Sequence, residues 1–159
     1  MLWLRILLFA LLVPGTALGL VPARLLGGGW AHAIELGAWH YAGLPVLAAG
    51  IALMAWCVVD FGRRGRGTPA PIDPPRRLVV SGPYAWVRNP MYVGAGLVVL
   101  GEAVFWEAPR LLAYLGGLGV ITHLFVVGYE ERALARKFGE DYQRYRARVP
   151  RWIPRPPRP

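Results

Sequence analysis

Long apolar runs separated by clusters of arginine constrain the fold of this chain more than any other feature. The runs cover about Leu2–Leu20, Tyr41–Val59, Met91–Trp106 and Leu111–Tyr129. A helix needs about 20 mostly apolar residues to cross a bilayer. The second run carries no charged residue, and the others are interrupted by single groups such as Arg5, Glu102 and His123. We therefore predict an all-α integral membrane protein with about four transmembrane helices.

The composition excludes two other classes of protein. Hydrophobic residues make up 55% of the chain, and only 17% of residues are charged, against about 25% in an average soluble domain. Intrinsic disorder requires low hydrophobicity and is excluded. The single cysteine, Cys57, excludes an internal disulfide and any multi-cysteine metal site. His32 and His40 are too isolated for a metal site, so no bound metal is expected.

The first apolar run has a second interpretation as a cleaved signal peptide. Ala17-Leu18-Gly19 ends the run with small residues, as a cleavage site does. However, the first five residues lack a clear positive region before the apolar segment. We therefore favour retention of residues 1–20 as a membrane span.

The positive charges predict an orientation in the membrane. The net charge is +9, but the basic residues are gathered in the segment 61–90 and after residue 130, which does not indicate a nucleic-acid partner. The other two connections hold only Arg24 and Arg110. Because positive residues remain cytoplasmic, both termini and the loop 61–90 are expected on that side of a cell (inner) membrane. Abundant Arg, Ala, Gly and Pro suggest a prokaryotic source.

The cytoplasmic loop changes character along its length. Gly62–Pro71 has a flexible, turn-forming composition. Leu78–Val80 is expected to be a short extended piece, followed by a turn at Ser81-Gly82-Pro83. Asn89 is disfavoured in a helix because Pro90 follows it, and Pro90 suits the first position of the third span. From composition alone, a simple re-entry loop with Tyr84 and Trp86 as interfacial anchors is equally well supported.

The segment after the fourth span predicts an interfacial helix. Apolar and aromatic residues recur there at helical spacing, at Leu134, Phe138, Tyr142 and Tyr145. Such a stripe is expected to face the membrane surface. Glu140 and Arg144 are spaced to form a favourable pair. The proline-rich tail from residue 150 to 159 cannot be helical, and its arginines should attract anionic lipid.

Glu130 and Glu131 lie where the fourth span meets this arginine-rich half. One interpretation is a solvated pair neutralised by the neighbouring arginines, which the residues alone favour. The other is an acidic clamp for a cationic ligand at the membrane surface.

Two motifs together resemble a known enzyme family. The first is SGPYAWVRNPMYVG at residues 81–94, and the second comprises Glu130-Glu131, FGEDY at residues 138–142, Tyr145 and Val149-Pro150. Both motifs, and the apolar hairpin between them, resemble the isoprenylcysteine carboxyl methyltransferases over residues 76–154. Phospholipid N-methyltransferases share this pattern, and membrane sterol reductases share it more distantly.

The resemblance implies a multipass methyltransferase that uses S-adenosylmethionine. Residues 1–60 would form two N-terminal spans, and residues 61–159 the methyltransferase-like region with its hairpin at 91–129. A carboxylate suits the cationic cofactor, and aromatic faces suit a sulfonium. Gly94 and Gly96 would allow close helix packing. The implied cofactor-binding residues are Arg77, Leu78, Val79, Tyr84, Asn89, Pro90, Met91, Tyr92 and Glu130.

The chain departs from the carboxyl methyltransferases at two positions. It has Asn89 where they have His, and Val126 where the prenylcysteine branch has an Arg for the substrate carboxylate. The expected acceptor is therefore a lipophilic or lipid-borne carboxyl, amine or thiol, and no catalytic residue is assigned. Two other classes remain open: an NADPH-dependent membrane reductase related to sterol reductases, and a non-catalytic membrane adaptor.

Two ionisable residues lie inside the predicted hairpin, which turns at Glu107–Arg110. Ionisable groups within a membrane are functional candidates by default. Glu102 and His123 lie on its two arms, and we expect them to hydrogen-bond each other rather than bind the acceptor. Cys57 is expected to be a small core residue.

Overall fold

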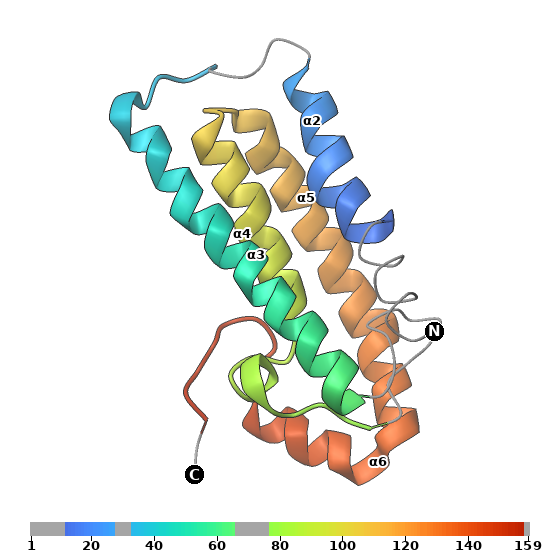
Figure 1. The fold of residues 1–159 in the computed structure, drawn as a ribbon. Helices are drawn as coiled ribbons and strands as arrows, with labels where there is room; N and C mark the ends of the chain where they lie inside the picture. Colours follow the sequence, from blue (N-terminus) through green and yellow to red (C-terminus); the bar gives the residue numbers. More distant parts are fainter. Residues whose placement is uncertain (1–11, 28–32, 66–76, 158–159) are drawn as a thin grey trace.

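The computed structural model describes residues 12–27, 33–65 and 77–157, and these residues form a helical bundle without a strand (Figure 1). The first described helix runs from Leu12 to Leu26 and includes η1 (Thr16–Leu20) and α2 (Val21–Leu26). The second, Gly37–Arg64, is made up of η2 (Gly37–Ala42), α3 (Gly43–Asp60) and all but the last residue of η3 (Phe61–Gly65). The all-α prediction is confirmed for the described residues.

The second half of the chain forms a hairpin and a helix across its end. A short 3₁₀ helix, η4 (Gly82–Ala85), precedes α4 (Pro90–Phe105). The chain then continues through α5 (Pro109–Phe125), η5 (Val126–Glu130) and α6 (Glu131–Arg148). Figure 1 shows α6 at the end of the bundle opposite the α4–α5 turn.

Prolines begin both arms of the hairpin. Pro90 and Pro109 stand at the first position of α4 and α5, where a missing N–H costs nothing. Asn89 has the non-helical backbone that the sequence predicts, with φ −121° and ψ 54°. The turn between the arms spans only Trp106 to Ala108, which confirms the tight hairpin.

Glycine brings α3 and α4 into direct backbone contact. A methyl group on Gly50 would lie 2.7 Å from the carbonyl oxygen of Gly94, and one on Gly101 would lie 2.7 Å from that of Gly43. Small residues permit such close approach between membrane helices. Gly94 therefore has the packing role expected of it. Gly96 does not, because a methyl group there would lie 3.7 Å from Leu115, an ordinary contact.

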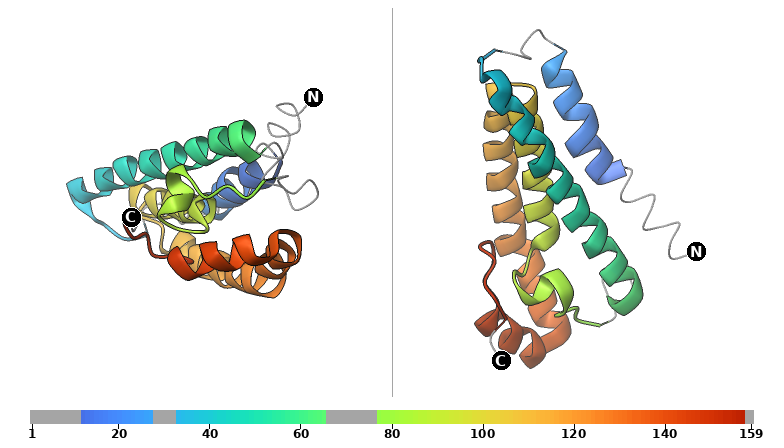
Figure 2. Two further views of the ribbon diagram at one scale, coloured as in Figure 1. Left: turned by 90° about the horizontal axis from the view of Figure 1, so that it is seen from below. Right: turned by 60° about the vertical axis from the view of Figure 1, so that its left-hand side comes forward.

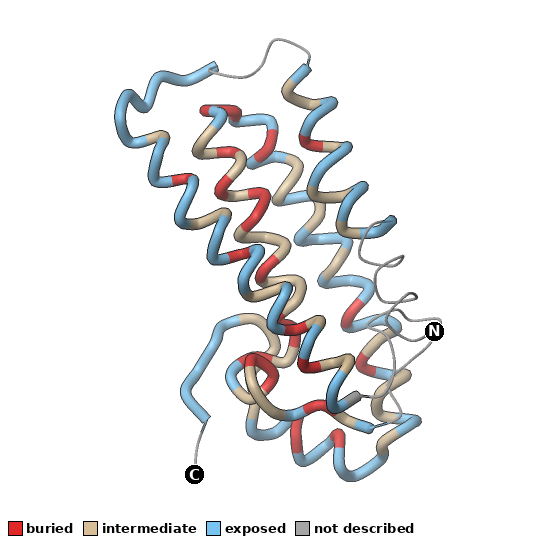
Figure 3. Tube along the Cα trace, in the orientation of Figure 1, coloured by how far each residue is buried: buried red, intermediate tan, exposed pale blue. Residues whose placement is uncertain are grey.

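The two longest described helices leave most of their apolar residues unburied. Gly37–Arg64 and Pro109–Arg148 are long and apolar enough to cross a membrane, whereas Leu12–Leu26 and Pro90–Phe105 are shorter apolar helices. Large apolar side chains on α5, such as Ile121 and Leu124, are more than 60% exposed. Figure 3 shows these exposed positions along the outer faces of the bundle. Exposed apolar surface of this extent fits contact with lipid.

The interfacial helix differs from its prediction in two respects and agrees with it in one. It is broken at Gly139, whose φ of 52° and ψ of −125° are non-helical and are readily adopted by glycine. Tyr142 and Tyr145 are buried as expected. The predicted pairing of Arg144 is wrong, because its guanidinium bonds Asp141 at 2.6 Å on the exposed face.

The loop before α4 is anchored to the end of α3. Leu78–Val80 is irregular rather than paired in a sheet. Ser81 Oγ donates a hydrogen bond of 3.4 Å to Asp60 Oδ2, and Arg64 binds the other oxygen of Asp60 at 3.1 Å. Tyr84 is buried and Trp86 is half-exposed, so Tyr84 is part of the core rather than an interfacial anchor.

Candidate active site

A cavity of about 740 Å³ lies between the two halves of the sequence motif. Its wall includes the helix Leu12–Leu26, the ends of α3 and α4, the loop before α4, α5 and the start of α6. One residue of the C-terminal tail, Trp152, completes the wall. The cavity therefore joins the arginine-rich end of the protein to the interior of the apolar helices.

Eight of the nine residues predicted to bind the cofactor line this cavity. They are Leu78, Val79, Tyr84, Asn89, Pro90, Met91, Tyr92 and Glu130. Arg77 is exposed and is not part of the wall. The structure thus gathers segments separated by a whole hairpin into one surface. That these residues bind a cofactor remains a prediction.

Tyr92 and Glu130 form a polar pair in the cavity wall. Tyr92, in the first turn of α4, donates a hydrogen bond of 3.1 Å from its hydroxyl to Glu130 Oε2. Burial raises the pKa of Glu130 above its usual range, the hydrogen bond from Tyr92 opposes this, and the charge of Glu131 adds to the rise. A bound cation would favour the ionised carboxylate. Glu130 is therefore a suitable partner for a positively charged ligand.

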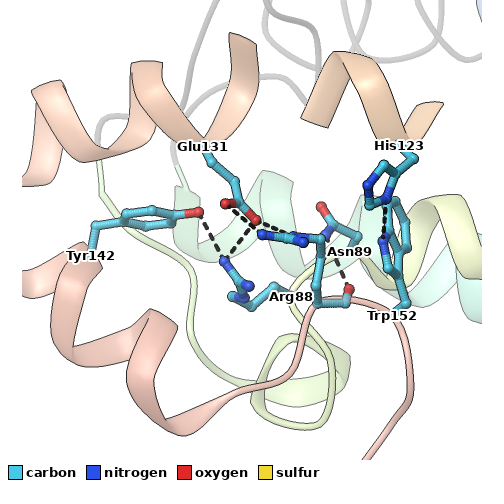
Figure 4. A network of polar contacts seen from close by, with 7 residues as sticks. Arg88, Asn89, His123, Glu131, Tyr142 and Trp152 are labelled. Carbon is cyan, nitrogen blue, oxygen red and sulfur yellow. Dashed lines mark hydrogen bonds and ion pairs between the residues drawn. The ribbon is translucent and has the colours of Figure 1, made fainter. Parts of the chain in front are cut away.

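Glu131 has a different environment, shown in Figure 4. Its carboxylate accepts hydrogen bonds from Arg151 at 2.6 and 3.1 Å and from Arg88 Nη1 at 2.9 Å. Tyr142 also accepts a bond from Arg88 Nη1 at 3.3 Å. Burial alone would raise the pKa of Glu131, but the Arg151 hydrogen bonds and both positive charges outweigh it and hold that pKa below its usual range.

Glu131 is neutralised by arginines, as the first interpretation of the Glu130–Glu131 pair expects, but it is buried rather than solvated. The side chain of Glu131 is 8% exposed and that of Arg88 is also 8% exposed. Buried ion pairs of this kind need several hydrogen bonds to offset the loss of hydration. One carboxylate ties structural elements together, and its neighbour faces the cavity.

The C-terminal tail folds back over the loop (Figure 2). Pro150 accepts a backbone hydrogen bond of 2.8 Å from Arg88, and Arg155 donates one of 3.0 Å to Trp86. The side chain of Asn89 donates to the carbonyl of Arg151 at 3.1 Å. Asn89 therefore holds the tail with its amide nitrogen, besides lining the cavity.

Three residues of this arrangement were not among the predicted site residues. Arg88 lies inside the first motif and Arg151 directly follows the second, while Tyr142 belongs to its FGEDY segment. The sequence signal that could have identified Arg88 and Arg151 is the presence of an arginine in or beside each of the two largely apolar and aromatic motifs. Their common partner, Glu131, could not be found from spacing alone.

His123 does not bind Glu102 as predicted. Its Nδ1 accepts a hydrogen bond of 3.1 Å from the indole nitrogen of Trp152 (Figure 4). Glu102 lies close before the hairpin turn and His123 lies far after it, so about ten residues, or ~15 Å of helix, separate their levels. The buried Oε2 of Glu102 has no hydrogen-bond partner in the part of the chain that the structure describes.

Val126, which replaces the arginine of the prenylcysteine branch, does not take part in the cavity. It is 1% exposed and does not line the cavity. The position that carries an arginine in the prenylcysteine branch is here a packed apolar residue. Among the described residues, no three His, Cys, Asp or Glu side chains are grouped so that they could hold a metal ion.

Comparison with known sequences decides the family. The pattern of the phospholipid methyltransferase family matches residues 38–141. This range includes α3, the loop, the hairpin and the start of α6, which together supply most of the cavity wall. The chain belongs to the phospholipid methyltransferase family. The membrane methyltransferase family expected from the two motifs is thereby confirmed.

Relatives in this family have different names. The chain is 32% identical over 100 residues, 63% of its length, to the cobalt-zinc-cadmium resistance protein CzcN of Cupriavidus metallidurans. It is 39% identical over 74 residues to methanethiol S-methyltransferase of Crocosphaera subtropica, and 37% over 84 residues to protein-S-isoprenylcysteine O-methyltransferase of Mus musculus. These matches cover 45% and 48% of this chain. They span 42%, 27% and 27% of the three relatives.

Proposed function

We propose that this phospholipid methyltransferase family member is an integral membrane enzyme that transfers a methyl group from S-adenosylmethionine to a lipophilic acceptor. The supporting observation is a cavity that joins a polar wall at Glu130 to an apolar wall between helices. The acceptor class is a carboxyl, amine or thiol carried by a lipid-soluble molecule.

The polar wall fits the cofactor. S-adenosylmethionine carries an ammonium, a carboxylate and the sulfonium that supplies its electrophilic methyl group. Glu130 would hold the ammonium through a charge-assisted hydrogen bond. Among the described residues, the buried Nε of Arg88 has no hydrogen-bond partner, and this donor would bind the carboxylate. Tyr84 and Tyr92 would present aromatic faces to the sulfonium or the adenine ring.

The apolar wall fits an acceptor that arrives from the bilayer. Ala17 and Leu18 of the first described helix and Leu115 and Leu118 of α5 line the cavity. None of these side chains can form a hydrogen bond or an ion pair. An acceptor with a hydrocarbon tail would place that tail here and its reactive head near Tyr92.

The protein's contribution to the reaction would be to position its reactants and exclude water. The Glu131 network and the tail hold the loop, α4 and α6 together around the cavity. Fixing two reactants in line removes much of the entropic barrier, and excluding water strengthens the polar contacts. Positioning the reactants and excluding water both require that the cavity wall be rigid.

The proposed topology has four spans in a cell (inner) membrane. Leu12–Leu26 and Pro90–Phe105 would cross beside the two longer helices. Both the loop before α4 and the helix α6 lie at one end of the bundle, and the α4–α5 turn lies at the other (Figure 1). The positive-inside rule then places the cavity's polar end and both termini in the cytoplasm.

Titration calorimetry on the detergent-purified protein tests the proposal. We expect micromolar binding of S-adenosylmethionine, and its loss in Glu130→Gln. Glu140→Gln is the matched control, because Glu140 is an exposed carboxylate of α6 outside the cavity wall. Absence of binding by the folded wild-type protein would reject the proposal, and NADPH binding in its place would indicate a reductase. Cofactor binding without methyl transfer to any lipophilic acceptor would indicate an adaptor.

A further inference from the structure

We infer that the outer face of α5 and α6 binds an anionic phospholipid, whose phosphate contacts Arg132 and Arg136 and whose acyl chain lies along α5. Neither arginine lines the cavity, so this lipid is not the methyl acceptor. The site requires only that α5 lies in the bilayer, and it does not depend on methyl transfer.

One continuous helix carries the whole site. Pro109–Arg148 is a helix of 40 residues, in which α5 continues through η5 into α6. The kink at Gly139 comes only after Arg136. The first turns of α6 therefore extend the outer surface of α5 beyond its apolar segment.

Every fourth residue along one face of this helix is exposed. The series is Val120, Leu124, Gly128, Arg132 and Arg136, and residues at this spacing lie on the same side of a helix. Val120 is 60% exposed and Leu124 is 64% exposed. A methyl group on Gly128 would meet nothing within 4 Å. The face therefore changes from apolar to cationic across an open position.

The two arginines at the end of this face are not neutralised by the described part of the protein. Arg132 and Arg136 have no ion-pair or hydrogen-bond partner among the described residues, whereas Arg88, Arg144 and Arg151 each bind a carboxylate. A guanidinium binds phosphate oxygens well because its N–H groups form a planar fork. Two such groups one helical turn apart suit a phosphate diester.

An exposed tyrosine marks the level of the membrane surface on this helix. Tyr129 is 49% exposed and stacks on Phe125, with 5.3 Å between ring centroids. Exposed tyrosines gather where the hydrocarbon core meets the headgroups. Leu124 then lies among acyl chains, and Arg132, about 12 Å further along the helix, lies among phosphates. One lipid molecule can therefore contact both ends of the face.

The charge of this surface favours a lipid with net negative charge. Phosphatidylcholine brings an ammonium as well as a phosphate to the two cations, and like charges repel. Phosphatidylglycerol brings the phosphate alone. The two lipids can have the same acyl chains, so their comparison isolates the charge of the headgroup.

Native mass spectrometry of the full chain in detergent tests the site. Dioleoyl phosphatidylglycerol and dioleoyl phosphatidylcholine are added in equal amounts, and we expect the first bound lipid to be phosphatidylglycerol. Its affinity should fall about 30-fold in Arg132→Gln/Arg136→Gln, as expected for the loss of two arginines at a lipid surface. Equal binding of the two lipids by the wild-type protein would overturn the inference.

Arg144→Gln/Arg148→Gln is the matched control. It removes the same charge at the same spacing from exposed positions of α6, but after the kink at Gly139. We expect it to leave phosphatidylglycerol binding unchanged. An equal loss in both double variants would indicate attraction by net charge alone and would overturn the site.

Glycerol phosphate, which has no acyl chain, distinguishes a lipid site from a free phosphate site. We expect no binding at a concentration at which phosphatidylglycerol saturates the protein. Equal affinity for glycerol phosphate would overturn the assignment to a lipid. Calorimetry with S-adenosylmethionine is unaffected by either result, so failure of this site and failure of the proposed function are separate outcomes.

Discussion

Arg88 and Glu131 join the loop before α4 to the first turn of α6 through a hydrogen-bonded ion pair of 2.9 Å. The two residues belong to motifs separated in sequence by the whole α4–α5 hairpin. Arg151 binds the same carboxylate and adds the tail. One buried carboxylate therefore connects three segments that surround the cavity.

Removing the charge of Glu131 should destabilise the protein strongly. Glu131→Gln leaves the buried guanidinium of Arg88 without its counter-ion, which costs about 3–5 kcal/mol in comparable buried pairs. Equilibrium unfolding in mixed detergent measures the change. Asp141→Asn is the matched control, because the Arg144–Asp141 pair is about 70% exposed and should contribute less than about 1 kcal/mol. Equal effects of both substitutions would contradict this account.

The same network predicts how stability depends on pH. The pKa of Glu131 is lower in the folded protein than its usual value, which is about 4.3 in unfolded chains. The unfolded state therefore binds more protons at acidic pH, and the stabilisation is full above that value. It is lost as the pH falls through the folded pKa. The melting-temperature difference between wild type and Glu131→Gln should shrink on acidification, and a constant difference would refute the link.

Cofactor affinity should also fall on acidification, but through Glu130 and beginning at a higher pH, because the pKa of this carboxyl is raised. Burial raises the pKa of this carboxyl, so protonation competes with binding of a cation over a wider acidic range. Below that pKa, the affinity for S-adenosylmethionine should fall about tenfold per pH unit. Calorimetry across the acidic range measures the slope. A wild-type slope that persists in Glu130→Gln would assign the effect to another group.

The contact between α3 and α4 should not tolerate a larger residue. A side chain in Gly50→Ala would lie 2.7 Å from the backbone of Gly94 and Val98, and overpacking of this kind typically costs about 1–3 kcal/mol. Gly96→Ala is the control, since its methyl group would meet only Leu115 at 3.7 Å. Thermal unfolding in detergent compares the two variants. A Gly50→Ala protein as stable as Gly96→Ala would show that the helices can separate without loss.

The local structure of this chain follows from short-range patterns. The apolar runs predict the helices, and Pro90 and Pro109 predict where α4 and α5 begin, because proline suits the first helical turn. The tight hairpin at Glu107–Arg110 was also predictable, since it leaves only a few residues between two apolar segments. The break at Gly139 was not predicted, although a glycine inside the helix was visible in the sequence.

The partners of individual polar side chains were decided by the tertiary structure. His123 and Glu102 share a hairpin, yet His123 binds Trp152 from the returning tail. Glu130 and Glu131 are adjacent, yet one meets Tyr92 and the other meets Arg88 and Arg151. Local spacing specifies which residues share a helix, because backbone hydrogen bonds have a fixed period. Which distant side chains meet depends on how helices pack and where the tail returns, and that is set by burial and close contact across the whole chain.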